Sequence, residues 1–500
     1  MAVSGIGGAA PRSLQALLEM RNQLDDLQRQ LGSGIKSNNY AGLGLDRGLT
    51  VGLRSQLSAI AGYQQTINHI GVRLDLMQTA LTQFTSAAQQ VKSKVLLQAK
   101  FALDGNQTQD QKTATTTLDQ LVGVLNTSDG DRYLFSGRTV DKAPVESTDH
   151  ILNGDGLKAG LIQLTSERRQ ADLGASGLGR LVIGMPTTSS VSLTEDAISP
   201  FGFKLAGASS SISGLTVSGP SGSPPDLAVD LSAAIPVDGD TIKYTFTLPD
   251  GTSRDLTLTA TSSATPGPGQ FTIGATPDDT ANNLLATLTV SLGTMANTEL
   301  AAASAVAAGN DFFNTDASNP PQRVDGPPFD TATAMIDGTA ANTVSWYLGD
   351  NATDDPRSTA LARADQSVTL SYGVRSNEEA LRLTVQSVAV FAAASFSASN
   401  PDAEGEYTAL QKRVGAALVG TPNQQHVADI QSQLAGVQVA LSSSKDRHDQ
   451  TNTTLQNLLQ SVQGVSTEEV AVKILSLQTT MQATLQTTAM LLQTNLLQYL

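Results

Sequence analysis

The stretch LRSQLSAIAGYQQTINHIGVRLDLMQTALTQFTSAAQQVKSKV, residues 53–95, decides the fold. Its apolar residues recur mostly at steps of three and four, and no proline interrupts them. This spacing is typical of the apolar seam of a long coiled-coil helix. At about 1.5 Å per residue, the helix would be about 65 Å long. The seam positions are Leu53, Leu57, Ile60, Ile67, Leu74, Leu81, Phe84, Ala88, Val91 and Val95.

A second proline-free seam runs through residues 425–463, near the other end of the chain. Its apolar residues include Val427, Ile430, Leu434, Val437, Leu441, Leu455, Leu458 and Val462. A shorter amphipathic helix is predicted outside each long one, over residues 12–31 and 467–500. The order of elements is therefore mirrored about the middle of the chain, which favours N- and C-terminal segments that pack side by side. Because isolated helices of this kind are marginal in water, we expect both terminal helices to be disordered in the monomer.

The middle of the chain has a different pattern. Fifteen of the 19 prolines lie between Pro186 and Pro356, and apolar residues alternate with polar ones around the turn PDGTSR. This pattern predicts a β-hairpin within a mainly β domain. ANNLLATLTVSL is interpreted as a short helix followed by a strand, and AAASAVAAGNDFF as another short helix. Two helix starts are also predicted, at Thr108 or Asp110 and at a capping box from Ser376 to Glu379.

Together these patterns predict an α+β fold, with a long antiparallel helical coiled-coil rod built from both termini and a central mainly β inserted domain. The expected division has five parts. They are an N-terminal polymerisation helix and loop (1–47), the N-terminal half of the rod with an extended region (48–180), an acidic outer domain (181–370), the C-terminal half of the rod (371–465) and a C-terminal polymerisation helix (466–500).

Charge and composition exclude several classes of function. The net charge is −15, and residues 181–370 hold six basic and 20 acidic side chains, so phosphate-rich partners such as nucleic acids would be repelled. The chain has no cysteine, which excludes disulfides and thiolate chemistry. No stretch is apolar enough for a membrane span, and the first residues lack the pattern of a secretory signal peptide. We therefore expect any export to use a route that needs no cleaved signal.

Catalytic and ligand motifs give no coherent site. The four histidines are dispersed, and no Walker loop, HExxH or GxSxG motif occurs. Gly42, Gly44 and Gly48 follow no predicted strand, which disfavours a phosphate loop. Asp350, Asp354 and Asp355 would suit calcium, but a polar turn before Pro356 is the favoured interpretation. The sequence predicts no enzyme, no cofactor and no metal site.

Two sets of motifs carry a family resemblance. LQALLEMRNQLDDLQRQLGSGIKSNNYAG resembles the opening helix and following turn of bacterial flagellins, with Ser33, Gly34 and Lys36 in the turn, although NNYAGLGLDR replaces the family's usual loop. Tyr133-Leu134-Phe135-Ser136-Gly137 and the ending LLQYL are more similar to the related protein at the hook–filament junction. The resemblance covers about residues 12–140 and 370–500, and leaves the middle unmatched.

The resemblance implies a self-assembling structural subunit of the extracellular bacterial flagellum, at the hook–filament junction or, alternatively, in the filament itself. It further implies as partners copies of the same chain, other hook and filament proteins, and a cytoplasmic export chaperone on the C-terminal helix. The residues expected at the polymerisation interface are Leu17, Leu24, Leu31, Ile474, Leu477, Met481, Leu485, Leu492, Leu496 and Tyr499. Those expected in the rod core are Leu53, Leu57, Ile60, Leu74, Leu81, Val91, Ile430, Leu434, Val437 and Leu455.

Two other classes of function stay open at this point. The middle domain would be an enzyme or binding module on a helical stalk if it held a convergent set of functional side chains, and none is evident. A cytoplasmic coiled-coil scaffold or signalling rod is disfavoured by the interrupting β region and by the lack of a membrane span.

Overall fold

The computed structural model describes residues 9–97, 101–130, 132–315 and 319–496, and the chain forms two compact units. Unit 1 contains Met1–Gly71, Ala362–Leu370 and Gln438–Leu500, and unit 2 contains Val72–Leu361 and Ser371–Val437. This division differs from the five predicted domains, because the two long helices each contribute to both units.

Unit 1 is built from helices of both chain ends. They are α1 (Ala9–Ser33), the 3₁₀ segment η1 (Tyr40–Asp46), the first half of α2 (Arg47–Leu96), the second part of α10 (Val427–Gln463), and α11 (Thr467–Leu496). A small hairpin of β15 (Leu361–Arg363) and β16 (Thr369–Ser371) provides residues 362–370 of this unit.

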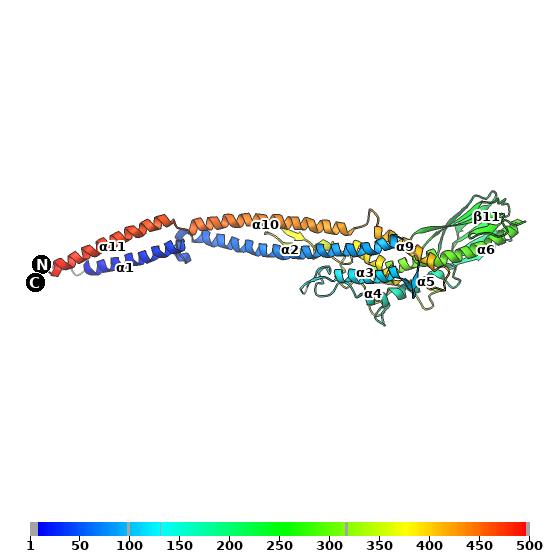
Figure 1. Cartoon of the computed structure of the whole chain (residues 1–500), viewed down its shortest axis with the longest axis horizontal. Helices are drawn as coiled ribbons and strands as arrows, with labels where there is room; N and C mark the ends of the chain where they lie inside the picture. Colours follow the sequence, from blue (N-terminus) through cyan, green and yellow to red (C-terminus); the bar gives the residue numbers. More distant parts are fainter. Residues whose placement is uncertain (1–8, 98–100, 131, 316–318, 497–500) are drawn as a thin grey trace. The chain divides into compact units, whose positions relative to one another are not determined.

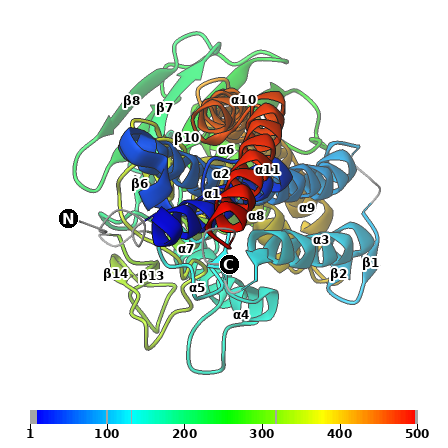
Figure 2. The ribbon, with the colours of Figure 1, turned by 90° about the vertical axis from the view of Figure 1, so that its left-hand side faces the viewer.

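Within unit 1, α2 and α10 run in opposite directions beside each other (Figure 1). Gln64 Nε2 donates to Asp449 Oδ1 at 2.6 Å, and Arg54 Nη2 donates to Gln463 Oε1 at 3.3 Å. α1 and α11 also lie side by side, as Figure 2 shows from the end of the unit. The pairing of N- and C-terminal segments that the mirrored order favoured is thus present in unit 1.

The terminal helices differ from the expectation of disorder in the monomer. Both α1 and α11 are helical in the single chain and pack on each other. The physical reason is that each supplies the apolar surface that the other needs, so neither is an isolated helix.

Unit 2 contains the remaining helices and two four-stranded sheets. The helices are α3 (Gln109–Leu125), α4 (Thr148–Asn153), α5 (Leu161–Leu173), α6 (Pro277–Met295), the π-helical turn η2 (Ala296–Leu300), α7 (Ala301–Phe313), η3 (Pro356–Thr359), α8 (Glu379–Ala393) and α9 (Ala403–Val419). The sheets have the strand orders β5-β6-β9-β8 and β12-β11-β10-β7.

The strands of the first sheet are β5 (Leu181–Gly184), β6 (Ser190–Glu195), β8 (Thr216–Ser221) and β9 (Asp226–Asp230), and those of the second are β7 (Lys204–Ser210), β10 (Thr241–Thr247), β11 (Ser253–Thr261) and β12 (Gln270–Thr272). The short pairs are β1 (Leu103–Asp104) with β2 (Gln107–Thr108), β3 (Ser128–Asp129) with β4 (Arg132–Tyr133), and β13 (Gln322–Val324) with β14 (Met335–Asp337). β10 and β11 pair antiparallel, with Tyr244 opposite Leu256, which confirms the predicted hairpin.

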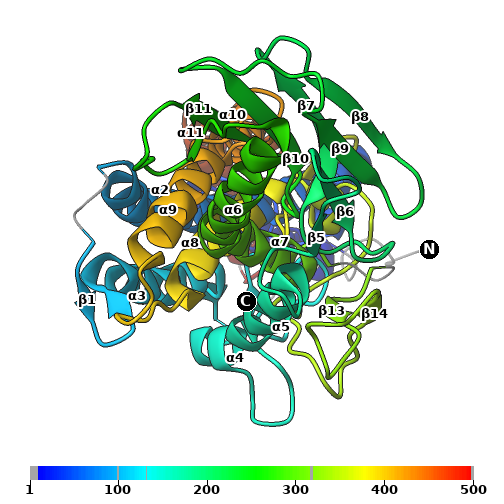
Figure 3. The ribbon, with the colours of Figure 1, turned by 90° about the vertical axis from the view of Figure 1, so that its right-hand side faces the viewer.

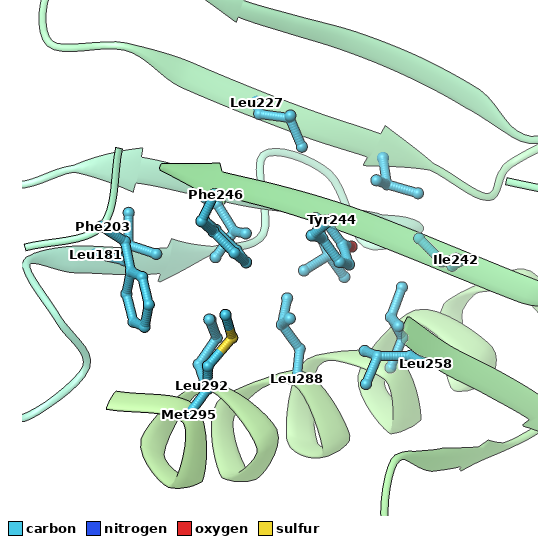
Figure 4. Packing of buried hydrophobic residues seen from close by; sticks show 14 of the residues in the cluster. Leu181, Phe203, Leu227, Ile242, Tyr244, Phe246, Leu258, Leu288, Leu292 and Met295 are labelled. Atoms are coloured by element: carbon cyan, nitrogen blue, oxygen red, sulfur yellow. The ribbon is translucent and has the colours of Figure 1, made fainter. Parts of the chain in front are cut away.

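One hydrophobic core joins both four-stranded sheets to α6 (Figures 3 and 4). Tyr244 and Phe246 of β10 point toward Leu288 and Leu292 of α6, and all four side chains are buried. The alternation along β10 places every second residue in this core, as expected for a strand with one buried face.

The middle region holds more helix than predicted. Residues 277–313 form one helical run, α6-η2-α7, where the sequence suggested a short helix, a strand and another short helix. The alternation of Leu288, Val290 and Leu292 resembles a strand, but Val290 is 70% exposed while both leucines are buried. A capping box between Thr276 and Asp279, with Pro277 in the first turn, starts the helix.

The two predicted helix starts have opposite outcomes. Thr108 caps α3, since its hydroxyl accepts from Gln111 N at 3.3 Å and Gln111 Oε1 accepts from Thr108 N at 2.9 Å. The capping box at Ser376 is wrong, because the Ser376 hydroxyl instead donates to Phe135 O at 3.0 Å and the cap residue of α8 is Glu378. Phe135 and Ser136 belong to the YLFSG motif, so this motif anchors the segment that leads into α8.

Candidate assembly surface

A short backbone connection fixes how α1 and α11 meet in unit 1. Lys36 N donates to Gln463 O at 2.7 Å, and Val465 N donates to Gly34 O at 3.1 Å. The Lys36 ammonium adds a bond to Val462 O at 2.8 Å. Gly34 has a φ of +70°, which favours glycine and allows the chain to leave α1 at this point. The turn after α1 is therefore tied to the turn between α10 and α11.

From this connection, α1 and α11 share an apolar seam within the single chain. Ile474 is buried, and Leu17, Leu24, Leu477 and Met481 are half-buried. Leu31 and Leu485 are exposed to 39% and 50%. Some of the predicted interface positions are therefore buried or half-buried between α1 and α11 of the same chain, and others are exposed to solvent.

Three predicted interface residues cannot be placed. The side chains of Leu492 and Leu496, in the last turns of α11, and the whole of Tyr499 lie outside the described residues.

The outward side of α11 carries apolar residues that the prediction missed. Val472, Leu475 and Met490 are 66%, 63% and 64% exposed. At 100° per residue, Val472 and Met490 lie on the side of the helix opposite Ile474 and Met481, and Leu475 lies on the flank beside them. On α1, Leu14 and Leu18 are likewise exposed, to 63% and 56%. We call these five residues the outward face.

α11 lacks charged residues on a side where they are expected. After Lys473, which pairs with Glu469 at 2.6 Å, residues 474–500 contain no Asp, Glu, Lys or Arg. A helix exposed to water in a soluble protein normally carries charged residues on its open side, whereas charged residues are depleted at the cores of protein interfaces. An uncharged helix with an apolar open side has the composition of a buried interface.

The predicted rod-core residues lie in the two units. In unit 1, Leu53 and Ile60 are buried, and Leu57 and Leu455 are half-buried. In unit 2, five of the predicted positions are buried, and Val437 is half-buried. The five buried positions are Leu74, Leu81, Val91, Ile430 and Leu434.

A histidine interrupts the apolar contacts of unit 1. His448 of α10 is 5% exposed and stacks on Tyr63 of α2, with ring centroids 5.6 Å apart and an interplanar angle of 12°. Its Nε2 lies 2.7 Å from Ala364 O in the β15–β16 hairpin. With Nε2 protonated, the imidazole donates to this carbonyl. His448 therefore attaches the hairpin to the helix pair.

The aspartates considered for calcium are paired with arginine. Arg138 contacts the carboxylates of Asp350 and Asp354, and the bond from Arg138 lowers the pKa of Asp354 to about 2. Asp355 accepts from Arg357 N at 3.0 Å, so it belongs to the polar turn. Across the described residues, no group of three or more His, Cys, Asp or Glu side chains is arranged to hold a metal ion.

A membrane span is also lacking in the described part of the chain, where no helix has the length and apolar character to cross a bilayer.

Comparison with known proteins gives a match to a protein family. Residues 9–139, about a quarter of the chain, match the family model for the bacterial flagellin N-terminal helical region. The matched segment includes α1, α2, α3 and the YLFSG motif. The search of curated proteins found no match. The match supports the flagellin family and a structural subunit of the bacterial flagellum.

Proposed function

We propose that this chain is an extracellular structural subunit of the bacterial flagellum and that it assembles with copies of itself through the outward face of α1 and α11. One observation carries the proposal: the 27 residues after Lys473 bear no charge, although part of this helix is open to solvent in the single chain. The sequence match over residues 9–139 agrees with it.

The energetics favour burial of the outward face by another copy. The seam between α1 and α11 covers only one side of each helix, which leaves Val472 and Leu475 exposed to water. Burying apolar surface stabilises an assembly by about 25 cal/mol per Å². A contact between the outward residues of α11 and those of α1 in the next copy joins two different surfaces, so it repeats from copy to copy and would form a polymer, with the long helices as a coiled-coil rod and the acidic middle domain outside.

The hook–filament junction is the favoured location, and the filament itself is the alternative. Residues 133–137 and the ending LLQYL support the junction, since both are similar to motifs of the junction protein. Immunogold labelling of cell-surface flagella distinguishes the two: a spot beside the hook supports the junction, and decoration of the whole length supports the filament.

The outward face also bears on how the protein would be exported and on its partners. A subunit with an exposed, uncharged helix risks premature association in the cell, so a cytoplasmic chaperone on α11 is proposed, as are contacts with other hook and filament proteins. Export in an unfolded state would not need a cleaved signal peptide. The middle domain is proposed to have no catalytic role.

The test introduces charge into the outward face. The double variant Val472→Asp/Leu475→Asp places two carboxylates on the open side of α11, while the seam residue Ile474 is unchanged. We expect loss of polymer in sedimentation and electron microscopy, with a monomer that stays helical by circular dichroism.

The matched control is Val290→Asp/Leu157→Asp in unit 2. Val290 and Leu157 are 70% and 89% exposed, so the control adds the same charge at equally open positions. It should polymerise normally. Polymers of normal length from the α11 variant would overturn the proposal.

A further inference from the structure

Unit 2 contains a hollow that the assembly proposal does not use. It has a volume of about 240 Å³ and is open to solvent on one side. Its walls come from α2, α8, the end of α9 and the start of α10. Gly420, with a φ of +75°, turns the chain out of α9 at its rim, and the His426 ring lies where a Cβ on this glycine would make close contact.

The ionisable side chains that line this hollow are all basic. Lys92 and His426 line it, and no aspartate or glutamate does. Within the described residues, neither the Lys92 ammonium nor the His426 ring has a hydrogen-bond or ion-pair partner. This is unusual in a chain with a net charge of −15.

The carboxylates that neighbour the lining residues in the sequence already have partners. Asp429 accepts from His426 N at 2.7 Å, and Glu379 accepts from Gln425 N at 3.2 Å. Glu378 contacts the Arg357 guanidinium and accepts from Arg375 N at 3.0 Å. These acidic groups therefore accept from backbone donors and an arginine, and none of them pairs with the Lys92 ammonium.

The rest of the lining is divided between apolar and neutral polar groups. Ala88 and Leu383 give an apolar wall in front of the fully buried Phe84, and Gln89 and Thr85 stand beside it. A cavity of about 150 Å³ holds a benzene ring, so about 240 Å³ has room for a ring together with a short polar group. Ligand sites combine an apolar wall with a few oriented polar groups in this way.

We propose that this hollow binds a small monocarboxylate with an apolar stem. The carboxylate lies against Lys92 and His426, and the stem packs on Ala88 and Leu383. The pairing satisfies the free ammonium of Lys92 with a charge-assisted hydrogen bond. The site lies wholly within unit 2 and does not depend on assembly.

Isothermal titration calorimetry on the full chain, kept dilute enough to stay monomeric, tests the proposal with three probes of equal stem: phenylacetate, 2-phenylethanol and phenethylamine. Phenylacetate should bind at least tenfold more tightly than the other two. Lys92→Met should weaken phenylacetate binding at least tenfold. Lys94→Met is the matched control, since Lys94 lies on the same helix, pairs with Asp110 and does not line the hollow, and it should leave binding unchanged.

A second variant tests the shape of the hollow without changing its basic groups. Ala88→Leu fills the hollow but keeps both basic groups, so it should abolish phenylacetate binding while the far-ultraviolet circular dichroism stays that of the parent chain. The proposal is overturned by equal binding of phenethylamine, by undiminished binding to the Lys92→Met chain, or by no phenylacetate binding to the parent. Such a result would leave the assembly proposal intact, because the titration measures no polymer.

Discussion

Ile474 and Leu475 are consecutive residues of α11 that face opposite environments: Ile474 is 9% exposed, whereas Leu475 is 63% exposed. The first belongs to the seam with α1, and the second belongs to the outward face. Substitutions at these two residues should therefore test the stability of the single chain and its capacity to assemble independently.

Truncating these two residues should have different effects on the monomer. Ile474→Ala should lower the free energy of unfolding of unit 1 by about 2 kcal/mol, because it removes buried methyl groups from a thin seam. Leu475→Ala should change it by less than about 0.5 kcal/mol, since its side chain is already in water. Urea unfolding followed by circular dichroism measures both. If both substitutions lowered the free energy of unfolding equally, α1 and α11 would not form a buried seam within the single chain.

The buried charge cluster of unit 2 should be sensitive to loss of its arginine. Arg413 of α9 is 9% exposed, and it contacts Asp250 at 2.8 Å and Glu299 of η2 at 2.7 Å. Arg413→Met leaves the buried Asp250 carboxylate without this partner, which should cost about 3 kcal/mol in thermal or urea unfolding of unit 2.

Lys243→Met, in the same unit, is the control for that measurement. Its ion pair with Asp255 is 2.7 Å long and about half exposed on both sides, so its loss should cost less than about 1 kcal/mol. An Arg413→Met chain as stable as the Lys243→Met chain would show that the cluster contributes nothing.

The Arg138–Asp354 pair should give a pH-dependent contribution to stability. The bond from Arg138 holds the pKa of Asp354 at about 2, below its ordinary value of 3.8. A depressed acid pKa stabilises the folded chain above pH 4, and this stabilisation is lost as the pH falls toward 2. Arg138→Gln should therefore lower the melting temperature at pH 7 but not at pH 2. Carboxyl NMR should show the Asp354 pKa rise toward 3.8 in the variant.

Removing the hydrogen bond of His448 should loosen the β15–β16 hairpin. His448→Phe keeps a ring beside Tyr63 but leaves Ala364 O without its donor, a loss of about 1 kcal/mol. Local opening, and with it tryptic cleavage after the exposed Arg363, should become about fivefold faster. His69→Phe, at an exposed position of the same helix pair, should not change the rate. Cleavage at equal rates in both variants would count against the attachment.

The helical ends were predictable because their pattern is strong and local. Steps of three and four over 40 residues, broken at Gly34 and Gly464, predict the long and short helices, and a helix cap at Thr108 or Asp110 can be predicted from a few neighbouring residues. The β10–β11 hairpin follows from alternation about a turn. These elements depend on neighbours in the sequence.

The features that could not be predicted from the sequence depend on tertiary contacts. The residues Leu288, Val290 and Leu292 fit a strand or a helix equally well, and only the position of α6 against two sheets decides. Ser376 matches a capping box, but its hydroxyl bonds to Phe135 O, 241 residues away. Val472 and Leu475 lie outside the seam, so seam periodicity assigns them no role, whereas the uncharged stretch after Lys473 is the signal that could have found the outward face.

The unbroken run from Pro277 to Phe313 has a mechanical consequence for unit 2. Its first half packs under the strands, and its second half packs on α5, α8 and α9. A force applied to the strands of unit 2 would therefore be transmitted through one continuous helical run to α5, α8 and α9, and the Arg413–Glu299 ion pair contacts this run at its π-helical turn. The sheets of unit 2 would move together with its helices, whereas a domain on a flexible linker would move independently.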